Sequence, residues 1–129
     1  MAAAVADWRP DIALNSKIKK GAEHKAPVLH LIENPDILAT LARHKSRPRL
    51  LIGFAAETDD VLTNALAKRK RKGADWIVAN DVSGGVMGGD LNQVHLITGK
   101  GQESWPQMSK LEVAERLVAR VADEFQGRA

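Results

Sequence analysis

Apolar residues follow two different periods along the chain, and these periods predict its secondary structure. Short apolar runs that end at Gly, Pro, Asn or Asp are typical of buried strands. Such runs predict strands at residues 2–6, 28–32, 50–54, 75–79 and 93–98. Residues 103–105 follow a turn at 99–101 and are expected to pair back antiparallel.

Two segments in the first half of the chain have the spacing and caps of helices. One begins at Asn34, the expected cap, with Pro35 in the first helical position and Asp36 favouring the helix dipole. The other starts after the cap candidates at 58–60 and ends in five consecutive cations, residues 68–72. Gly73 follows these cations and is expected to stop that helix.

A third helix is predicted at the end of the chain, where Ser109 and Glu112 match a capping box. Apolar residues recur there every three or four positions, which predicts a single core-facing side. The residues expected on that side are Leu111, Ala114, Leu117, Val118, Val121 and Phe125.

Residues 14–32 are predicted to form a long hairpin arm with a basic tip. Residues 12–20 alternate loosely between apolar and polar and end in the cations Lys17, Lys19 and Lys20. An arm of this kind has unpaired strand edges, so it is a candidate for a dimerisation element or a lid.

The order strand, arm, helix, strand, helix, strand, hairpin, helix predicts an α/β fold with a mainly parallel sheet and flanking helices. The 129 residues, 44% apolar and 27% charged, suit one domain over residues 1–129. The run at residues 2–6 lacks the helix that normally precedes a central strand, so we expect the chain to be part of a longer protein.

Composition excludes several kinds of chemistry and partner. The chain has no cysteine, hence no disulfide or thiolate chemistry, and this fits a cytoplasmic location. No run of apolar residues is long enough to span a membrane. Residues 84–89 are rich in glycine, but Asp90 stands where a phosphate loop needs lysine, so a surface loop is the better interpretation. The histidines, at positions 24, 30, 44 and 95, lack paired metal-ligand spacing and are interpreted as core or surface residues.

The candidate chemistry lies in the cations and in one aspartate. Lys68 and Lys72 are four residues apart on one helix face, close to the expected carboxyl ends of the strands, where α/β folds bind ligands. On spacing alone a solvated helix end explains this lysine pair equally well, but the pair and the cations near Lys17 together favour an anionic, phosphorylated ligand. Asp7 ends the first predicted strand and could accept hydrogen bonds from a base or ribose, or act as a turn residue.

Seven segments in this order resemble the phosphopantothenoylcysteine synthetase domain of the bacterial bifunctional coenzyme A biosynthesis flavoprotein. The resemblance covers essentially the whole chain, and its specificity comes from the order and spacing of the segments. The segments are AAVADW (3–8), KIKK (17–20), NPDIL (34–38), GFAAET (53–58), the Lys68/Lys72 pair, ANDVS (79–83) and SKLEVA (109–114).

The resemblance implies a CTP-dependent phosphopantothenate–cysteine ligase that acts through an acyl-cytidylate. It also implies a modified Rossmann-type fold, magnesium dependence and a homodimer, with CTP, 4′-phosphopantothenate and cysteine as the molecules bound. Lys17 would act as a catalytic lid lysine, and no magnesium ligand is assigned. The implied CTP contacts are Asp7, Lys17, Asn34, Pro35, Asp36, Ile37, Phe54, Lys68 and Lys72.

The chain departs from the family pattern because roughly the first half of the synthetase domain has no counterpart in it. The flavin-dependent decarboxylase that usually precedes that domain has none either, so FMN is not expected on this chain. We therefore expect little ligase activity from the chain alone, with the missing part as a candidate partner. The alternatives are a small basic nucleic-acid-binding protein and a fragment that only dimerises through the arm. Two Phe, no Tyr and a net charge of +3 disfavour nucleic acid as a partner.

Overall fold

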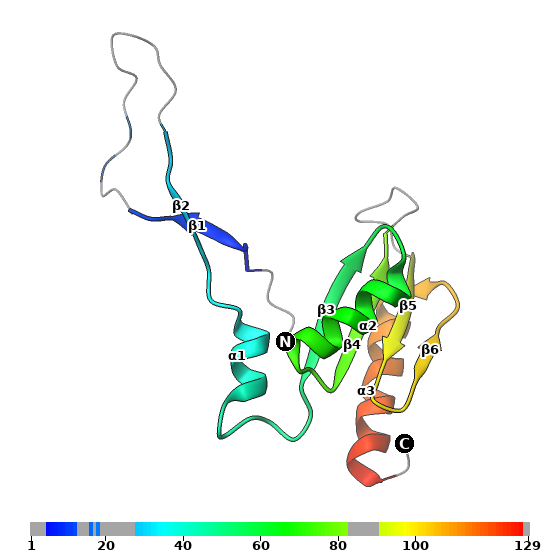
Figure 1. The fold of residues 1–129 in the computed structure, drawn as a ribbon. Helices are drawn as coiled ribbons and strands as arrows, with labels where there is room; N and C mark the ends of the chain where they lie inside the picture. Colours follow the sequence, from blue (N-terminus) through cyan, green and yellow to red (C-terminus); the bar gives the residue numbers. More distant parts are fainter. Residues whose placement is uncertain (1–4, 13–15, 17, 19–27, 83–90, 128–129) are drawn as a thin grey trace.

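The computed structural model describes residues 5–12, 16, 18, 28–82 and 91–127. In this part of the chain a central sheet carries helices on both faces, and a two-stranded arm projects away from it (Figure 1). The elements in chain order are β1 (Trp8–Pro10), β2 (Leu31–Glu33), α1 (Ile37–Arg43), β3 (Ile52–Glu57), α2 (Val61–Lys72), β4 (Trp76–Asp81), β5 (Leu91–Ile97), β6 (Gln102–Ser104), β7 (Met108–Ser109) and α3 (Lys110–Gln126).

The sheet is mixed, which confirms the α/β class but corrects the expectation of a mainly parallel sheet. Its strand order is β3-β4-β5-β6, with β7 paired to β5. β3 and β4 are parallel because α2 connects them as a crossover, whereas β5 is antiparallel to both β4 and β6. The short turn before β6 can join only antiparallel neighbours, so the predicted pairing of residues 103–105 with the preceding strand is confirmed for β6.

An antiparallel two-stranded ladder is present, but most of residues 14–27 lie outside the described residues, so the hairpin over residues 14–32 stays a prediction. Trp8 pairs with Glu33 and Pro10 with Leu31, so the strand expected at residues 28–32 begins only at Leu31. The buried strand expected at residues 2–6 is wrong for its described residues, since Val5 and Ala6 are exposed and lie outside any strand. A strand of small apolar residues is stable only between neighbouring strands, and the described residues place none beside it.

One of the three predicted helix starts differs in its capping residue, whereas α2 begins directly after Asp60, one of the predicted cap candidates. Asp36, and not Asn34, caps α1, and its carboxylate accepts from the Ala39 N–H at 3.0 Å. Asp60 precedes α2 in a left-handed conformation with φ of 43° and makes no side-chain cap. The α3 capping box is confirmed in both directions, and so is Gly73 as the left-handed residue that ends α2.

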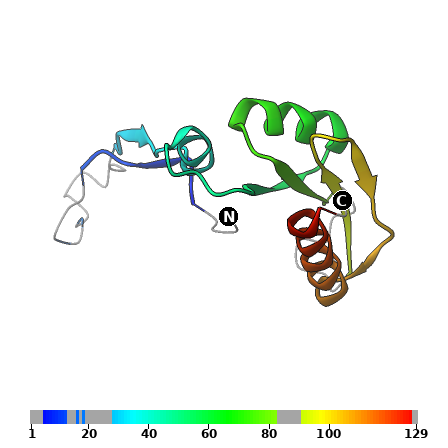
Figure 2. The ribbon, with the colours of Figure 1, turned by 90° about the horizontal axis from the view of Figure 1, so that it is seen from below.

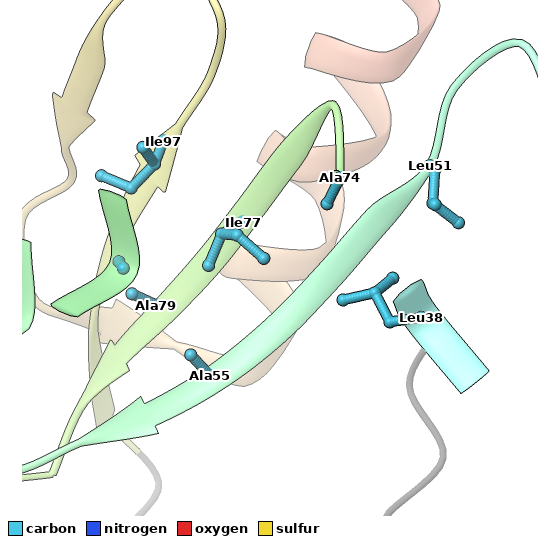
Figure 3. Packing of buried hydrophobic residues seen from close by; sticks show 8 residues of the cluster. Leu38, Leu51, Ala55, Ala74, Ile77, Ala79 and Ile97 are labelled. Atoms are coloured by element: carbon cyan, nitrogen blue, oxygen red, sulfur yellow. The ribbon is translucent and has the colours of Figure 1, made fainter. Parts of the chain in front are cut away.

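Two apolar clusters hold the layers together, one on each face of the sheet. The first packs α1 and α2 against the sheet through small residues such as Ala55, Ala65 and Ala79, with Leu38 and Ile77 among them (Figure 3). The second packs α3 against larger side chains and surrounds Trp105, which is 1% exposed. Figure 2 shows α2 and α3 on opposite sides of the sheet.

Candidate functional site

A cavity of about 580 Å³ lies beside β3. Its walls come from residues 5–7, the start of α1, the last turns of α2, the ends of β4 and β5, and the start of α3. The residues that line it are Val5, Ala6, Asp7, Glu33, Asn34, Pro35, Asp36, Ile37, Leu38, Gly53, Phe54, Ala55, Ala56, Lys68, Lys72, Val78, Asn80, Asn92, Lys110 and Val113.

The alternation of side chains along β3 divides this cavity into two compartments. Ala55 belongs to the cluster under α1 and α2, so that face of β3 looks toward Lys68 and Lys72. Phe54 pairs with Val78, which belongs to the cluster under α3, so Phe54 points to the opposite face. A ligand that touches both Phe54 and the lysines must therefore pass over the edge or the carboxyl end of β3.

The lysine compartment already contains its own anions. Lys72 Nζ forms a hydrogen-bonded ion pair with the Asp36 carboxylate, which joins α2 to the start of α1. Lys68 Nζ lies 3.9 Å from Glu57 Oε1 at the end of β3. Both lysines are in the last turns of α2, where the helix dipole favours cations. A polyphosphate would have to compete with these two carboxylates for the lysines.

Asp36 has two roles at this site. The hydrogen bond from Lys72, opposed by partial desolvation and aided by the Ala39 N–H, lowers the pKa of the Asp36 carboxyl below its ordinary value. The ionised carboxylate thereby occupies an amide at the start of α1 that a ligand anion would otherwise use. This wall of the cavity therefore favours a neutral polar group over a second anion.

Asn34 fastens the beginning of the chain to the wall of the cavity. Its Nδ2 donates to the Ala6 carbonyl at 2.8 Å, and its backbone N–H donates to the Asp7 carbonyl at 2.7 Å. Its Oδ1 accepts from Arg9 Nη1 at 2.8 Å. Asn34 thus holds Asp7 at the cavity, while the Asp7 side chain stays exposed.

The structure brings together every predicted CTP contact that it describes. The eight that line the one cavity are Asp7, Asn34, Pro35, Asp36, Ile37, Phe54, Lys68 and Lys72. Lys17, the predicted catalytic lysine, lies outside the described residues, as does the glycine-rich segment at 84–89. The geometry shows that the eight residues are neighbours; their contact with a nucleotide stays a prediction.

Twelve of the residues that line the cavity were not among the predicted contacts, and five of these twelve come from β4, β5 and α3. These five are Val78, Asn80, Asn92, Lys110 and Val113. Asn80 Nδ2 donates to Asn92 Oδ1 at 3.1 Å across β4 and β5, and Asn80 Oδ1 and Asn92 Nδ2 are buried without a hydrogen-bond partner among the described residues. The sequence offered one signal, the polar pair Asn80-Asp81 at the end of β4. Asn92 lies beside Asn80 only because β4 and β5 pair antiparallel, and the sequence pattern did not predict that pairing.

Two negative findings concern metals and membranes. Among the described residues no group of three or more His, Cys, Asp or Glu side chains could hold a metal ion. His95 is a buried core residue that hydrogen-bonds Ser104 at 2.8 Å, and His30 and His44 are exposed, as predicted. Within the same ranges no helix has the length and apolar character needed to cross a bilayer.

A family model and curated proteins match almost the entire chain. The model described as "DNA/pantothenate metabolism flavoprotein C-terminal domain" matches residues 1–125. The "Coenzyme A biosynthesis bifunctional protein CoaBC" of Vibrio cholerae is 38% identical over 95% of this chain and 31% of that protein. The protein of the same name from Mycobacterium bovis is 41% identical over 98% of this chain and 33% of that protein. The chain spans about a third of the length of these relatives.

The fold agrees with these relationships. The crystal structure of the C-terminal domain of coenzyme A biosynthesis bifunctional protein CoaBC superposes with a TM-score of 0.70 at 33% identity. The superposition covers 97% of this chain but 53% of that domain. The α/β, Rossmann-like architecture is therefore shared, and just over half of the solved domain is represented here.

Proposed function

Because the chain belongs to the family of the DNA/pantothenate metabolism flavoprotein C-terminal domain, we propose that it carries the nucleotide-binding part of a phosphopantothenate–cysteine ligase of coenzyme A biosynthesis. The observation that carries this proposal is that one cavity gathers Phe54, Lys68, Lys72 and residues 34–37 from three segments of the chain. A solvated helix end, the competing interpretation of the lysines, does not account for this convergence.

The proposed reaction has two steps. The carboxylate of 4′-phosphopantothenate attacks the α-phosphate of CTP, which forms an acyl-cytidylate and releases pyrophosphate. The amine of cysteine then attacks the acyl carbon. The amide bond forms, the nitrogen loses one proton, and CMP leaves. Both steps move negative charge onto phosphate oxygens, and fixed cations stabilise such charge most effectively in a partly desolvated cavity.

The shape of the cavity suggests how the nucleotide would lie in it. The exposed face of Phe54, 45% accessible, offers an apolar surface for the base or ribose on the α3 side of β3. Lys68 and Lys72 would bind the triphosphate on the α2 side, after exchanging Glu57 and Asp36 for phosphate oxygens. Residues 34–37 and Asp7 would bind neutral polar groups of the base or ribose, since Asp36 opposes a second anion there.

Lys17 is proposed to act as a lid lysine. By analogy with the family it would close over the reacting phosphate, where an ammonium on a flexible side chain could follow the charge as it develops. Substitution of Lys17 tests this role.

Magnesium is proposed to enter with the nucleotide. Mg²⁺ usually binds through substrate phosphates and one or two carboxylates, and a nucleoside triphosphate would supply such phosphates. The ion would neutralise phosphate charge. The proposal also includes a cytoplasmic location, with which the absence of cysteine is compatible.

Calorimetry with Mg²⁺ and each of CTP, ATP, GTP and UTP tests the proposal. We expect CTP to bind most tightly, and Lys68→Ala or Lys72→Ala to weaken it about 10- to 100-fold, the value of one charge-assisted hydrogen bond. Lys70→Ala is the matched control, because it removes the same charge from the same helix at an exposed position outside the cavity. It should change the affinity less than about twofold.

Equal binding of all four nucleotides would contradict the cytidine preference. Equal effects of the three lysine substitutions would show that α2 acts only as a basic surface. Lys17→Ala should leave CTP binding largely intact and should lower the rate of acyl-cytidylate formation once the other half of the domain is supplied. A rate like that of the wild type would exclude the lid role.

We also propose that the chain forms a homodimer through the arm. Trp8 and Leu31 are 58% and 53% exposed on a ladder of two strands, and Val28, which precedes β2, is 81% exposed. A two-stranded ladder is only marginally stable on its own in water. Sedimentation should show a dimer that Leu31→Asp dissociates. Leu91→Asp, at a residue 57% exposed on the sheet, is the control and should leave the dimer intact. A monomeric wild-type chain would contradict this part of the proposal.

A further inference from the structure

A second cavity, of about 390 Å³, lies at the amino ends of β3 and β4. It is bounded by residues that begin or precede these two strands, by the turn between β5 and β6, by Arg69 of α2 and by the last turns of α3. Among the described residues the two cavities share no lining residue. Because α/β folds bind nucleotides at the carboxyl ends of their strands, this cavity lies outside the proposed nucleotide site.

The carboxylates that line the second cavity already have cationic partners. The three pairs are Asp75 with Arg47, Glu103 with Arg120 and Glu124 with Lys100, at N···O distances of 2.6, 2.5 and 3.9 Å. Two more cations, Arg49 and Arg69, line the cavity, and within the described ranges neither has a carboxylate partner. The cavity therefore contains two guanidinium charges that no described carboxylate pairs with.

Arg69 has hydrogen-bonding capacity that its surroundings leave unused. Its Nε is buried and has no hydrogen-bond partner among the described residues. Its Nη1 lies 3.5 Å and 3.4 Å from the carbonyl oxygens of Ala74 and Asp75, which is long for a hydrogen bond. These contacts fit a role in closing the end of α2, but that role leaves the Nε–H without an acceptor. A buried donor without an acceptor is unfavourable, so an anion that reached it would be stabilised.

Arg49 and the turn between β5 and β6 contribute to the polar wall of the second cavity. The Arg49 guanidinium stacks on the Phe125 ring at 5.0 Å, a contact that uses its face and leaves its N–H edge for an anion. A Cβ built on Gly99 would lie 3.8 Å from Arg69 Nη1, so the turn passes close to Arg69. Each guanidinium is therefore positioned by a neighbour, one by a ring and the other by a turn.

We propose that the second cavity binds a small phosphate monoester, with its phosphate on Arg69 and Arg49. A guanidinium donates two parallel N–H bonds to phosphate oxygens, and a phosphate dianion matches the charge of two guanidinium groups. The Nε–H of Arg69 gains the acceptor that the described residues do not supply. Leu50 and Trp76, which also line the cavity, offer an apolar surface to the organic part of the ligand.

Phenyl phosphate is the test ligand, because it joins a phosphate to a small apolar body. Titration of the full chain, followed by NMR, should shift the Arg69 Nε–Hε resonance as the cavity fills. Arg69→Ala should weaken binding about tenfold or more, and Arg49→Ala about threefold or more, as expected for lost charge-assisted hydrogen bonds. Arg71→Ala is the matched control, because it removes the same charge from an exposed position of α2 outside both cavities. It should change the affinity less than about twofold.

A conservative variant separates the guanidinium from its charge. Arg69→Lys keeps the positive charge but removes the Nε–H and the planar fork, so it should still weaken binding about fivefold or more. Circular dichroism checks that each variant keeps the wild-type helix content. Lys68→Ala, which changes the first cavity only, should leave the affinity for phenyl phosphate unchanged.

Four results would overturn the proposal. Phenyl phosphate does not bind the folded chain, or Arg69→Ala and Arg71→Ala weaken it equally, which would show a merely basic surface. Arg69→Lys keeps the wild-type affinity, or benzoate binds as tightly as phenyl phosphate, which would favour a carboxylate. Loss of binding in Lys68→Ala would likewise overturn it, because the ligand would then lie in the first cavity. CTP binding is not a readout, so these outcomes are independent of the proposed function.

Discussion

The two faces of the sheet are built by different means. On the α1 and α2 face, small residues bring the backbones together, and a Cβ added to Gly53 would lie 2.6 Å from Leu38. On the α3 face, large side chains such as Trp76 and Trp105 fill a thicker layer, and α3 leaves one apolar side uncovered. Close packing thus positions the lysine compartment, whereas the Phe54 compartment lies on a face that is only partly covered.

The largest expected effect comes from the α3 face. Trp105→Ala removes a side chain that is 1% exposed and should lower the free energy of unfolding by about 3–5 kcal/mol. Phe125→Ala, on the uncovered side of α3, should cost less than about 1 kcal/mol. Urea unfolding measures both. If the two substitutions lower the free energy of unfolding by similar amounts, Phe125 is packed in solution, and the two sides of α3 do not differ in burial.

On the α1 and α2 face of the sheet, an added methyl group should destabilise the fold. Gly53→Ala should cost about 1–3 kcal/mol, because the new methyl group meets both Leu38 and Ile77 closer than 3.0 Å. Gly99→Ala is the control, since its nearest atom would be Arg69 Nη1 at 3.8 Å, an ordinary contact. If thermal unfolding shows the two variants to be equal, α1 is free to move away from β3.

A smaller effect is expected at the end of α2. Gly73 has φ of 68°, and a Cβ there would lie 3.1 Å from Ala42 of α1. Gly73→Ala should therefore cost about 1 kcal/mol for the left-handed conformation, plus the contact with α1. Gly127→Ala has the same conformational cost without a neighbour within 4 Å, so the difference in urea unfolding isolates the contact. If the two substitutions lower the free energy of unfolding equally, a side chain at position 73 does not contact Ala42, and α1 lies farther from α2.

The smallest effect is electrostatic and depends on pH. The pKa of Asp36 is lowered by Lys72, so the ionised pair stabilises the fold above the ordinary value of 3.8 and stops doing so as pH falls below it. Asp36→Asn should therefore be slightly less stable than wild type at neutral pH, and the difference should vanish in acid. In a Lys72→Met background the same substitution should show little pH dependence. A difference that persists at pH 2 would exclude the ion pair as its cause.

The sequence predicted best what local patterns determine. The capping box of α3, the glycine after α2 and the short hairpin of β5 and β6 all depend on neighbouring residues, and all are confirmed. Residues 2–6 have the composition of a buried strand, but burial depends on neighbouring strands, and Val5 and Ala6 are exposed. Local rules also favoured Asn34 as a cap, whereas its bonds to Ala6 and Arg9 are long-range.

The site residues that belong to the family's motifs could be predicted from the resemblance. Those that come together only through strand pairing could not. Phe54, Lys68 and Lys72 were named in advance and line the cavity. Asn80, Asn92 and Lys110 come from three elements, and only the antiparallel pairing and the position of α3 bring them together. Leu111, Val118 and Phe125 were predicted on the buried side of α3, but they are 69%, 68% and 48% exposed. Apolar periodicity shows which residues of a helix can be buried, but not how many of them a neighbouring element covers.

The ion pair between Lys72 and Asp36 gives the proposed site a means of discrimination among ligands. A phosphate can take Lys72 only by displacing a carboxylate that the protein itself holds in place. A monophosphate exchanges one anion for another and gains little. A triphosphate reaches Lys68 as well and brings more charge than Asp36 and Glu57 together. The internal carboxylates would thus act as competitors that set a threshold of charge, which pyrophosphate and nucleoside triphosphates pass and inorganic phosphate or CMP does not.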